Sequence, residues 1–336
     1  MTNEIKSLLE AAYTGNVLSQ VDMKQLVSFF MSGEADTVQI AGSLVGLAAR
    51  GETADEIAGA ALGMRSEMLS FQASPDAIDV CGTGGDGSGS LNISTAVAFV
   101  LAGAGIPVAK HGNRAQSSKS GAADVLASLG LNLEANQDIV EAAFRTANTA
   151  FMLATRHHPA MRFVGPVRQK LGIRTLFNLL GPLCNPAGVK RQLIGVFSPD
   201  WLEKMAVAAR TLGSETAWLV HGDGMDELAI SGTSQVVELK QGDITSFEIN
   251  PEDAGLRAYP LSALKGGNAE YNAAAMTQLF DGAPGAYRNA VLLNAAAGIL
   301  VAGVETDLKI AASLAEKSID GGSAGSALSK LIEAVK

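Results

Sequence analysis

Apolar residues three or four positions apart recur throughout residues 1–70, with polar residues between them. This spacing is typical of helices with one buried face. Asp22 and Asp36 stand where helix N-caps are expected, and Thr53 with Glu56 has the pattern of a capping box. The sequence therefore predicts a small unit made only of helices, whose remaining apolar faces need a partner.

Strand and helix patterns alternate along residues 71–165. Short apolar runs predict buried strands at Ala77–Cys81, Ile106–Ala109 and Ala150–Ala154. Helices are expected from near Asn92–Ser94, over Ala122–Leu129 and over Asp138–Ala147. Such alternation is typical of a mostly parallel sheet with helices on its faces.

The second half of the chain resumes this alternation after a helical interruption. Residues 160–189 have a helical pattern that breaks at Gly181-Pro182, and Thr155–Pro159 before them is expected to be a loop. Strands are predicted at Leu193–Phe197 and Ala217–Val220, followed by antiparallel strands over Glu227–Glu248 and mostly helix from about Asn268 onward.

We therefore expect an α/β protein built from two domains. Residues 1–70 plus about 166–189 would form a small all-helical domain. Residues from about 71–165 plus 190–336 would form a large α/β domain with a mostly parallel central sheet flanked by helices. The chain would cross between the domains near residues 71, 165 and 190, and these crossings would act as hinges.

Composition and charge limit the partners and the cellular location that we expect for the protein. The chain has 336 residues and a formal net charge of −9, which argues against nucleic acid as a general partner. Its two cysteines, Cys81 and Cys184, provide no disulfide framework and no zinc spacing. The first thirty residues lack a secretory signal, and the longest apolar stretch, Ala290–Gly303, is too short to span a membrane. We expect a soluble, cytoplasmic protein.

A glycine-rich turn follows the first predicted strand. Five glycines lie between Gly82 and Gly89, and a helix begins shortly after them. Lys110 ends the next strand, and a hydroxyl-rich segment, Ser117–Ser120, precedes a further helix. Backbone N–H groups, hydroxyls and cations at helix N-termini suit a phosphate ligand.

Two common phosphate motifs fit this turn poorly. Gly82-x-Gly84-x-x-Gly87 matches the dinucleotide fingerprint, but Lys110 stands where a nicotinamide site wants an acidic residue. No Gly-Lys-Ser/Thr of a Walker loop is present. His157-His158 does not indicate a metal site either, because no cysteine or carboxylate lies nearby at ligand spacing.

Several longer motifs together resemble the anthranilate phosphoribosyltransferases of tryptophan biosynthesis. They occur in the family's order across the middle half of the chain, as Gly82-Thr83-Gly84-Gly85-Asp86, Asn92-Ile93-Ser94-Thr95, Lys110-His111-Gly112-Asn113-Arg114, Ser117-Ser118, His158-Pro159-Ala160-Met161, Pro166-Val167-Arg168, Gly172-Ile173-Arg174-Thr175, Phe177-Asn178-Leu179-Leu180-Gly181-Pro182-Leu183 and Asp223-Gly224-Met225-Asp226-Glu227. The resemblance implies the nucleoside phosphorylase/phosphoribosyltransferase class III fold and a homodimer formed through the helical N-terminus.

The resemblance also implies a reaction, the second step of tryptophan biosynthesis from chorismate. This pentosyltransferase reaction joins the amine of anthranilate to C1 of 5-phosphoribosyl 1-pyrophosphate and releases pyrophosphate. The attacking amine is neutral at pH 7, so no general base is assigned. Mg²⁺, with two ions expected, would bind together with the pyrophosphate substrate.

The family's motifs assign binding residues at both ends of the site. Those implied for 5-phosphoribosyl 1-pyrophosphate are Gly82, Thr83, Gly84, Gly85, Asp86, Asn92, Ser94, Thr95, Lys110, Ser117 and Ser118. Metal ligands would be Ser94, Asp226 and Glu227, with Asp86 as a further candidate. Those implied for anthranilate are Gly82, His111, Asn113, His158, Arg168, Gly181 and Pro182. Arg174 competes with Arg168 for the substrate carboxylate on sequence grounds, and the Pro-Val-Arg match favours Arg168.

The sequence departs from the family pattern at three places. Ala154-Thr155 stands where many relatives have Ala-Pro, Ala122 replaces a common Ser, and Cys184 replaces a common Thr. Two other classes of protein are alternatives. A pyrimidine nucleoside phosphorylase would leave Asp226-Glu227 and Asn178–Pro182 unexplained. A non-catalytic, nucleic-acid-binding relative predicts a basic surface or a degraded glycine turn, and neither is present.

Overall fold

The N-terminal helices form a bundle, as the apolar spacing predicts. A computed structural model describes residues 1–115 and 119–336. The bundle contains α1 (Asn3–Tyr13), α2 (Gln20–Ser32), α3 (Thr37–Arg50) and α4 (Ala54–Arg65). Asp36 caps α3, and Thr53 with Glu56 forms the expected capping box of α4. The prediction for Asp22 is wrong, because Ser19 is the N-cap of α2 and its hydroxyl accepts a hydrogen bond from the Asp22 N–H.

A single seven-stranded sheet forms the centre of the larger part. Its strands are β1 (Ile78–Gly82), β2 (Val108–Gly112), β3 (Thr149–Leu153), β4 (Arg191–Gly195), β5 (Thr216–Gly222), β6 (Ser234–Lys240) and β7 (Asp243–Ile249). The order is β3-β2-β1-β4-β5-β6-β7, in which β6 pairs antiparallel with both β5 and β7 and the other neighbours are parallel. The expected mostly parallel sheet with an antiparallel edge is confirmed, although the segment from Glu227 to Thr233 is not a strand.

The strand order reverses between β1 and β4. The chain builds outward from β1 through β2 to β3, and then returns to the other side of β1 to add β4 and β5. Open α/β sheets bind ligands at the carboxyl ends of strands beside such a reversal. The glycine-rich turn follows the carboxyl end of β1, so the topology places it at this position.

Helices cover both faces of the sheet. They are α5 (Ile93–Gly103), α6 (Ala122–Ser128), α7 (Gln137–Ala147), α8 (Ala154–His157), α9 (Met161–Leu171), α10 (Phe177–Leu183), α11 (Leu202–Thr211), α12 (Ala269–Phe280), α13 (Ala286–Ala302), α14 (Leu308–Asp320) and α15 (Ser323–Ala334). Short 3₁₀ helices lie at Pro199–Trp201, Pro251–Ala254 and Leu261–Leu264. The loop expected at Thr155–Pro159 is instead mostly helical, because α8 extends to His157.

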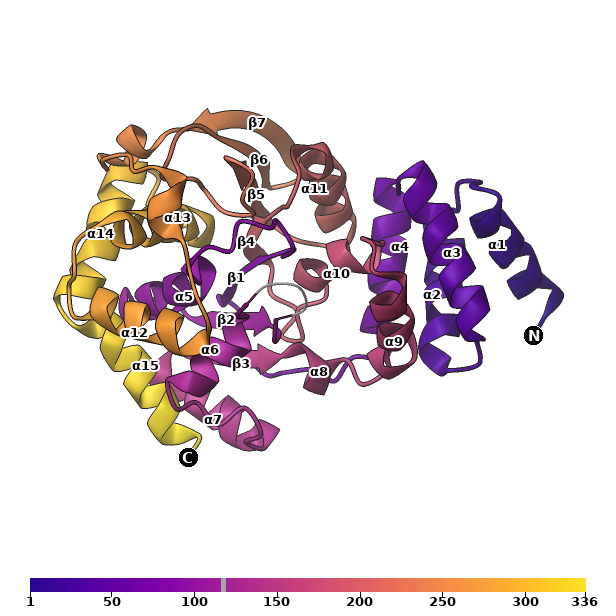
Figure 1. The fold of residues 1–336 in the computed structure, drawn as a ribbon, viewed down its shortest axis with the longest axis horizontal. Helices are drawn as coiled ribbons and strands as arrows, with labels where there is room; N and C mark the ends of the chain where they lie inside the picture. The colour runs from indigo at the N-terminus through magenta and orange to yellow at the C-terminus, as the bar shows by residue number, and fades with distance from the viewer. Residues whose placement is uncertain (116–118) are drawn as a thin grey trace.

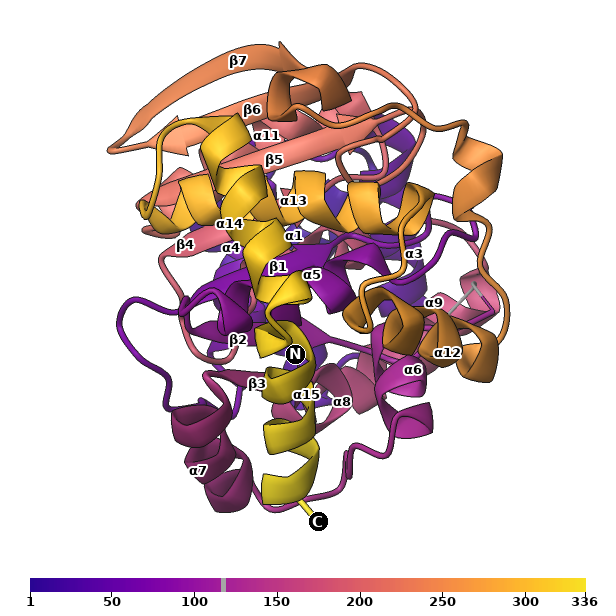
Figure 2. The same cartoon turned by 90° about the vertical axis from the view of Figure 1, so that its left-hand side faces the viewer.

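Two large hydrophobic cores lie on opposite faces of the sheet. Helices α5, α13, α14 and α15 pack on the face turned toward the viewer in Figure 2. On the other face α11, α10 and the bundle share one continuous core. Neighbouring residues of β4 illustrate the division, since Leu193 belongs to the first core and Ile194 to the second, as expected where side chains alternate along a strand.

Helices α9 and α10 join the N-terminal bundle although they follow it by about a hundred residues in sequence. Helix α9 packs against α2 and α3, and α10 packs against α4 and also reaches β1 and β2. Figure 1 shows α10 between the sheet and the bundle, which forms the right-hand end of the molecule. Within the described residues no helix is long and apolar enough to cross a membrane.

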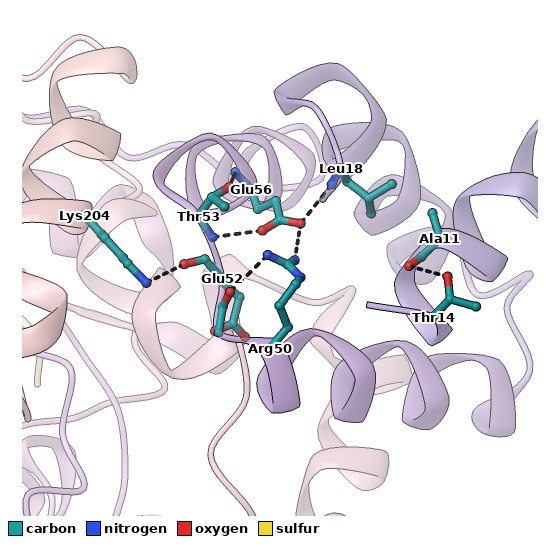
Figure 3. A network of polar contacts seen from close by, with 9 residues as sticks. Ala11, Thr14, Leu18, Arg50, Glu52, Thr53, Glu56 and Lys204 are labelled. Atoms are coloured by element: carbon teal, nitrogen blue, oxygen red, sulfur yellow. Dashed lines mark hydrogen bonds and ion pairs between the residues drawn. The ribbon is translucent and has the colours of Figure 1, made fainter. Parts of the chain in front are cut away.

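A polar network joins the bundle to α11 (Figure 3). The Lys204 ammonium of α11 donates to the Glu52 carbonyl at 3.0 Å, in the turn between α3 and α4. Beside it the buried Glu56 carboxylate pairs with Arg50 and accepts the N–H groups of Leu18 and Thr53. Since a buried charge is tolerated only when it is paired and hydrogen-bonded, this network fixes the turn against the α/β part of the molecule.

Candidate active site

The glycine-rich turn after β1 presents unpaired backbone N–H groups. Gly84, Gly85 and Gly87 have φ values of +70°, +73° and +78°, a region that other residues rarely adopt. The N–H groups of Gly85 and Asp86 have no acceptor among the residues the structure describes. Successive free N–H groups in such a turn form a concave anion site. The turn therefore has the geometry that a phosphate ligand requires.

Asp226 and Glu227 lie beneath this turn, on the loop after β5. Asp226 Oδ2 accepts the Gly84 N–H at 2.7 Å, and Glu227 Oε1 accepts the N–H of Ser94, in the first turn of α5, at 3.1 Å. Gly82 and Gly195 pair across β1 and β4, and a Cβ on either would overlap Asp226. The two carboxylates are thus locked to the turn and to the start of α5.

The surroundings raise the pKa of both carboxyl groups. For Asp226 the main cause is burial, followed by the nearby carboxylate of Asp86. For Glu227 burial is again the main cause, followed by Asp226, while the charge of Lys110 acts in the opposite direction. Such groups favour a cation that would relieve their mutual repulsion.

The oxygen donors here fit a hard divalent cation shared with a substrate. Within residues 1–115 and 119–336, no group of three His, Cys, Asp or Glu side chains could hold a metal ion. Mg²⁺ usually takes one or two carboxylates together with substrate phosphates rather than an all-protein cage. The adjacent Asp226 and Glu227 with the Ser94 hydroxyl meet that description.

Lys110 lies under the same turn and is almost completely buried. Its ammonium donates to the Val80 carbonyl and lies 3.4 Å from the Ser94 hydroxyl. Asn92 and Thr95, also predicted to contact phosphate, have other contacts in this structure. The Asn92 side chain accepts a hydrogen bond from Asn272 at 2.8 Å and does not cap α5, and Thr95 is buried. Ser117 and Ser118 lie outside the described residues.

A buried pair that the sequence analysis did not identify supports Lys110 and its neighbour His111. Asp79 in β1 accepts the Asn185 amide at 2.7 Å and the His111 backbone N–H at 3.1 Å. Asn185 also donates to the Ala109 carbonyl at 2.9 Å. Burial raises the pKa of Asp79, and its attraction to Lys110 opposes this rise. An acidic residue inside the otherwise apolar strand Ile78–Cys81 is the signal that could have revealed Asp79.

Two histidines face each other beside the turn. The rings of His111 and His158 lie 5.1 Å apart. His111 Nδ1 bonds the Gly181 carbonyl and His158 Nε2 bonds the Cys184 carbonyl, each at 3.0 Å. Because a carbonyl only accepts, these nitrogens carry the protons. His111 Nε2 and His158 Nδ1 are therefore bare acceptors, and both are buried without a partner in the part of the chain that the structure describes.

Both imidazoles are neutral at pH 7. Burial, and next the neighbouring His158, lower the pKa of His111 to about 3. Burial likewise lowers the pKa of His158 to about 4. The pair therefore offers lone pairs and no charge to a ligand.

Arg168 and Arg174 have different surroundings. The guanidinium of Arg168 on α9 is half-buried 5.6 Å from the Phe177 ring and forms no ion pair with a described residue. Arg174 instead donates to the Gly85 carbonyl and stacks on Phe197 at 3.8 Å. Arg168 is thus free to bind a substrate carboxylate, whereas Arg174 is already bound to Gly85 and Phe197.

The remaining residues predicted to bind anthranilate differ in their burial and hydrogen bonds. Gly181 contributes its carbonyl to His111, while Pro182 is buried and its carbonyl accepts from Gln192 at 2.7 Å. Asn113 is half-buried and its side chain accepts the Arg114 N–H at 2.8 Å. Gly82 is half-buried at the end of β1.

The sheet carries an anion-binding turn at the point where its strand order reverses, and it is joined to a helical bundle. Together these features define a class of protein. The α/β-domain profile of a glycosyl transferase family matches residues 74–325, and the family's helical-bundle profile matches residues 6–68. The chain belongs to this family.

Relatives that match over nearly the whole chain place it, within this family, among the anthranilate phosphoribosyltransferases. The anthranilate phosphoribosyltransferase of Rhodopseudomonas palustris strain TIE-1 is 54% identical over 330 residues, 98% of each chain. That of Brucella canis is 53% identical over 329 residues, 98% of this chain and 97% of its own.

Solved structures show the same fold over the whole chain. The Thermus thermophilus enzyme superposes with a TM-score of 0.92 at 43% identity, covering 98% of this chain and 99% of its own. The Saccharomyces cerevisiae enzyme, in complex with PRPP and Mg, gives 0.89 at 27% identity and covers 98% of both chains.

Proposed function

We propose that the protein transfers the 5-phosphoribosyl group of 5-phosphoribosyl 1-pyrophosphate (PRPP) to the amine of anthranilate. The observation that carries the proposal is the juxtaposition of an anion-binding turn, an unpaired arginine and two neutral imidazoles, in a chain 54% identical to a named enzyme of this activity. The amine nitrogen bonds to C1 of the ribose, the C1–O bond to pyrophosphate breaks with its electron pair, and one amine proton is lost.

The turn and Lys110 would bind the diphosphate. The free N–H groups of Gly85 and Asp86 supply donors, and Lys110 supplies a positive charge beneath them. Mg²⁺ neutralises charge that develops on the leaving diphosphate. Asp226, Glu227 and Ser94 would hold this ion, and two ions are part of the proposal, with Asp86 as a ligand of the second.

The acceptor would lie between α9, α10 and the end of β2. Arg168 pairs with its carboxylate, because burying that charge without a partner is costly. The bare His111 Nε2 and His158 Nδ1 accept hydrogen bonds from the amine, which aims its lone pair at C1. Neutral imidazoles suit this task, since protonated rings would repel the hydrogens.

The experiment is a transfer assay with purified protein, PRPP, Mg²⁺ and anthranilate. Loss of anthranilate fluorescence, with phosphoribosylanthranilate identified by mass spectrometry, is expected, and chelation of Mg²⁺ should abolish it. A parallel incubation of pyrimidine nucleosides with phosphate tests the phosphorylase alternative, which the comparisons do not favour. Phosphorolysis without consumption of anthranilate would refute the proposal.

We also propose a homodimer formed through the bundle and a division in which residues 1–70 and about 166–189 move as one domain. Exposed apolar side chains on the bundle support the dimer, namely Tyr13, Val17, Val21, Val38 and Val45. The packing of α9 and α10 on α2–α4 supports the domain division. Light scattering at micromolar concentration tests the dimer, and a monomer would refute it.

A further inference from the structure

Arg174 connects the helical part of the molecule to the glycine-rich turn. It lies between α9 and α10, which pack on the N-terminal bundle. From there its guanidinium reaches across to the α/β part, where it donates to the Gly85 carbonyl. Nothing in the transfer reaction itself requires this arginine, because Lys110 and Arg168 already supply the cations of the two substrate ends.

The contact determines which way a peptide group of the turn points. The chain contains no cis peptide bond in its described part, and in a trans peptide the C=O and N–H point in opposite directions. When Arg174 holds the Gly85 carbonyl, the N–H of Asp86 is directed away from Arg174. That N–H is one of the two free donors of the anion site.

Other hydrogen bonds hold the residues around the Gly85–Asp86 peptide but not the peptide itself. Gly85 has φ +73°, and a glycine moves easily between backbone conformations. The Gly84 N–H bonds Asp226, and the Asp86 side chain accepts the N–H groups of Ser88 at 3.1 Å and Asp226 at 3.4 Å. The peptide between Gly85 and Asp86 has Arg174 as its hydrogen-bond partner.

Arg174 is itself held by a stack. Its guanidinium lies 3.8 Å from the centroid of the Phe197 ring, and the Phe197 N–H donates to the Thr83 hydroxyl at 3.0 Å. A cation is attracted to the face of an aromatic ring. Phe197, which follows β4, therefore orients the guanidinium and is itself hydrogen-bonded to the turn through Thr83.

We propose that Arg174 is a positioning residue that orients the Gly85–Asp86 peptide for diphosphate binding and ties the turn to the α9–α10 segment. This role rests on the proposed function, because it names a residue that prepares the same site. Through Arg174 the α9–α10 segment would affect PRPP binding directly and independently of the anthranilate site.

The test compares Arg174→Ala and Arg174→Lys with Arg162→Ala. Arg162 is a matched control, an exposed arginine on α9 whose guanidinium stacks on Phe163 at 4.6 Å, remote from the turn in sequence and without a side-chain hydrogen bond to a described residue. Arg174→Ala should raise the KM for PRPP about fivefold to tenfold, equivalent to about 1–1.4 kcal/mol. The kcat and the KM for anthranilate at saturating PRPP should stay within about twofold, a shift of about 0.4 kcal/mol.

Rescue and stack variants separate positioning from other roles. Arg174→Lys should recover part of the PRPP affinity, since an ammonium can bond the carbonyl but stacks less well. Phe197→Leu keeps the cation and removes the stack, so it should raise the KM for PRPP about threefold, or about 0.7 kcal/mol. A raised KM in Arg174→Ala with an unchanged value in Phe197→Leu would indicate direct phosphate contact and overturn the positioning role. An unchanged KM in Arg174→Ala would overturn it as well.

A binding measurement keeps this inference separate from the reaction. Calorimetric titration with pyrophosphate and Mg²⁺ should show weaker binding in Arg174→Ala than in Arg162→Ala, with equal thermal midpoints. If the unmodified protein transfers nothing to anthranilate but binds pyrophosphate in this Arg174-dependent way, the proposed function fails and the positioning role stands. If transfer occurs and pyrophosphate affinity is independent of Arg174, only the positioning role fails.

Discussion

Replacing Arg168 by Ala should damage the use of anthranilate and leave PRPP binding intact. The guanidinium is half-buried against Phe177 and has no acidic partner among the described residues, so a substrate carboxylate would be its counter-charge. Truncating one member of a buried, hydrogen-bonded charge pair costs about 2–5 kcal/mol. Because Arg168 is only half-buried, we expect the lower part of this range, about 2–3.5 kcal/mol.

This free energy translates into a large kinetic effect. At about 1.4 kcal/mol per tenfold, kcat/KM for anthranilate should fall roughly thirtyfold to three-hundredfold. The assay is steady-state kinetics with each substrate varied in turn, and aniline serves as an acceptor without the carboxylate. The activity with aniline should be nearly the same in Arg168→Ala and in the unmodified protein, because the lost contact involves only the carboxylate.

Two further variants make the result specific. Arg168→Lys should recover only part of the loss, since an ammonium cannot form the bidentate pair. Arg162→Ala, six residues earlier on α9, controls for loss of a cation from the same helix. An unchanged KM and kcat for anthranilate in Arg168→Ala would refute the assignment of Arg168 as the carboxylate partner.

Three other predictions concern groups around the turn. Changing Asp226→Asn together with Glu227→Gln should abolish most Mg²⁺-dependent transfer, because the side chains keep their size and lose the charge that a divalent ion needs, and the test is a Mg²⁺ titration of the rate. Asp79→Ala should lower the free energy of unfolding by about 3–5 kcal/mol in urea denaturation, because it removes the buried acceptor of the Asn185 amide and the His111 N–H and a charge that attracts Lys110. In His158→Asn, the loss of stability between pH 7.5 and pH 5 should be about 2 kcal/mol smaller than in the unmodified protein.

The sign of the last prediction follows from the lowered pKa of His158. In the unfolded chain a histidine titrates near 6.5, whereas the pKa of His158 in the folded protein is about 4. Between these values the unfolded state binds more protons, so stability is complete above about pH 6.5 and is lost as the pH falls toward 4. Urea denaturation at both pH values measures this difference, and an equal loss in the variant would contradict it.

The other two predictions also have definite tests. Asp76→Ala is the control for Asp79→Ala, since Asp76 is exposed and its 3.6 Å pair with Arg191 lies at the surface, where such changes shift stability by about 0.5 kcal/mol or less. A comparable effect of both substitutions would show that Asp79 has no special structural role. Near-normal turnover of the Asp226/Glu227 double variant at saturating Mg²⁺ would remove these residues from the metal site.

Local patterns in the sequence were sufficient for most of the secondary structure. The helices of residues 1–70, the capping box of Thr53 and Glu56, and the strands beginning near Ala77, Ile106 and Ala150 were predicted, because apolar periodicity reflects which face of an element is buried. The errors lie where neighbouring signals compete. The sequence predicts Asp22 as a cap, but Ser19 three residues earlier fulfils that role, and it predicts a loop at Thr155–Pro159, most of which is helical.

The motifs and the order of helices and strands in the sequence indicate the class of site. They do not indicate which residues of the site contact one another. Asp79 and Asn185 are separated by 106 residues, and their hydrogen bond exists only because α10 returns the chain to the edge of β1 and β2. Glu227 accepts the Ser94 N–H because β4 and β5 pair beside β1, and Arg174 reaches Gly85 from the segment between α9 and α10. The sequence determined which side chains carry charge and which turns can bind anions, since these are properties of residues and their neighbours. Only the tertiary structure decided which charge meets which turn, because that depends on contacts between segments whose separation in sequence contains no information about their distance in space.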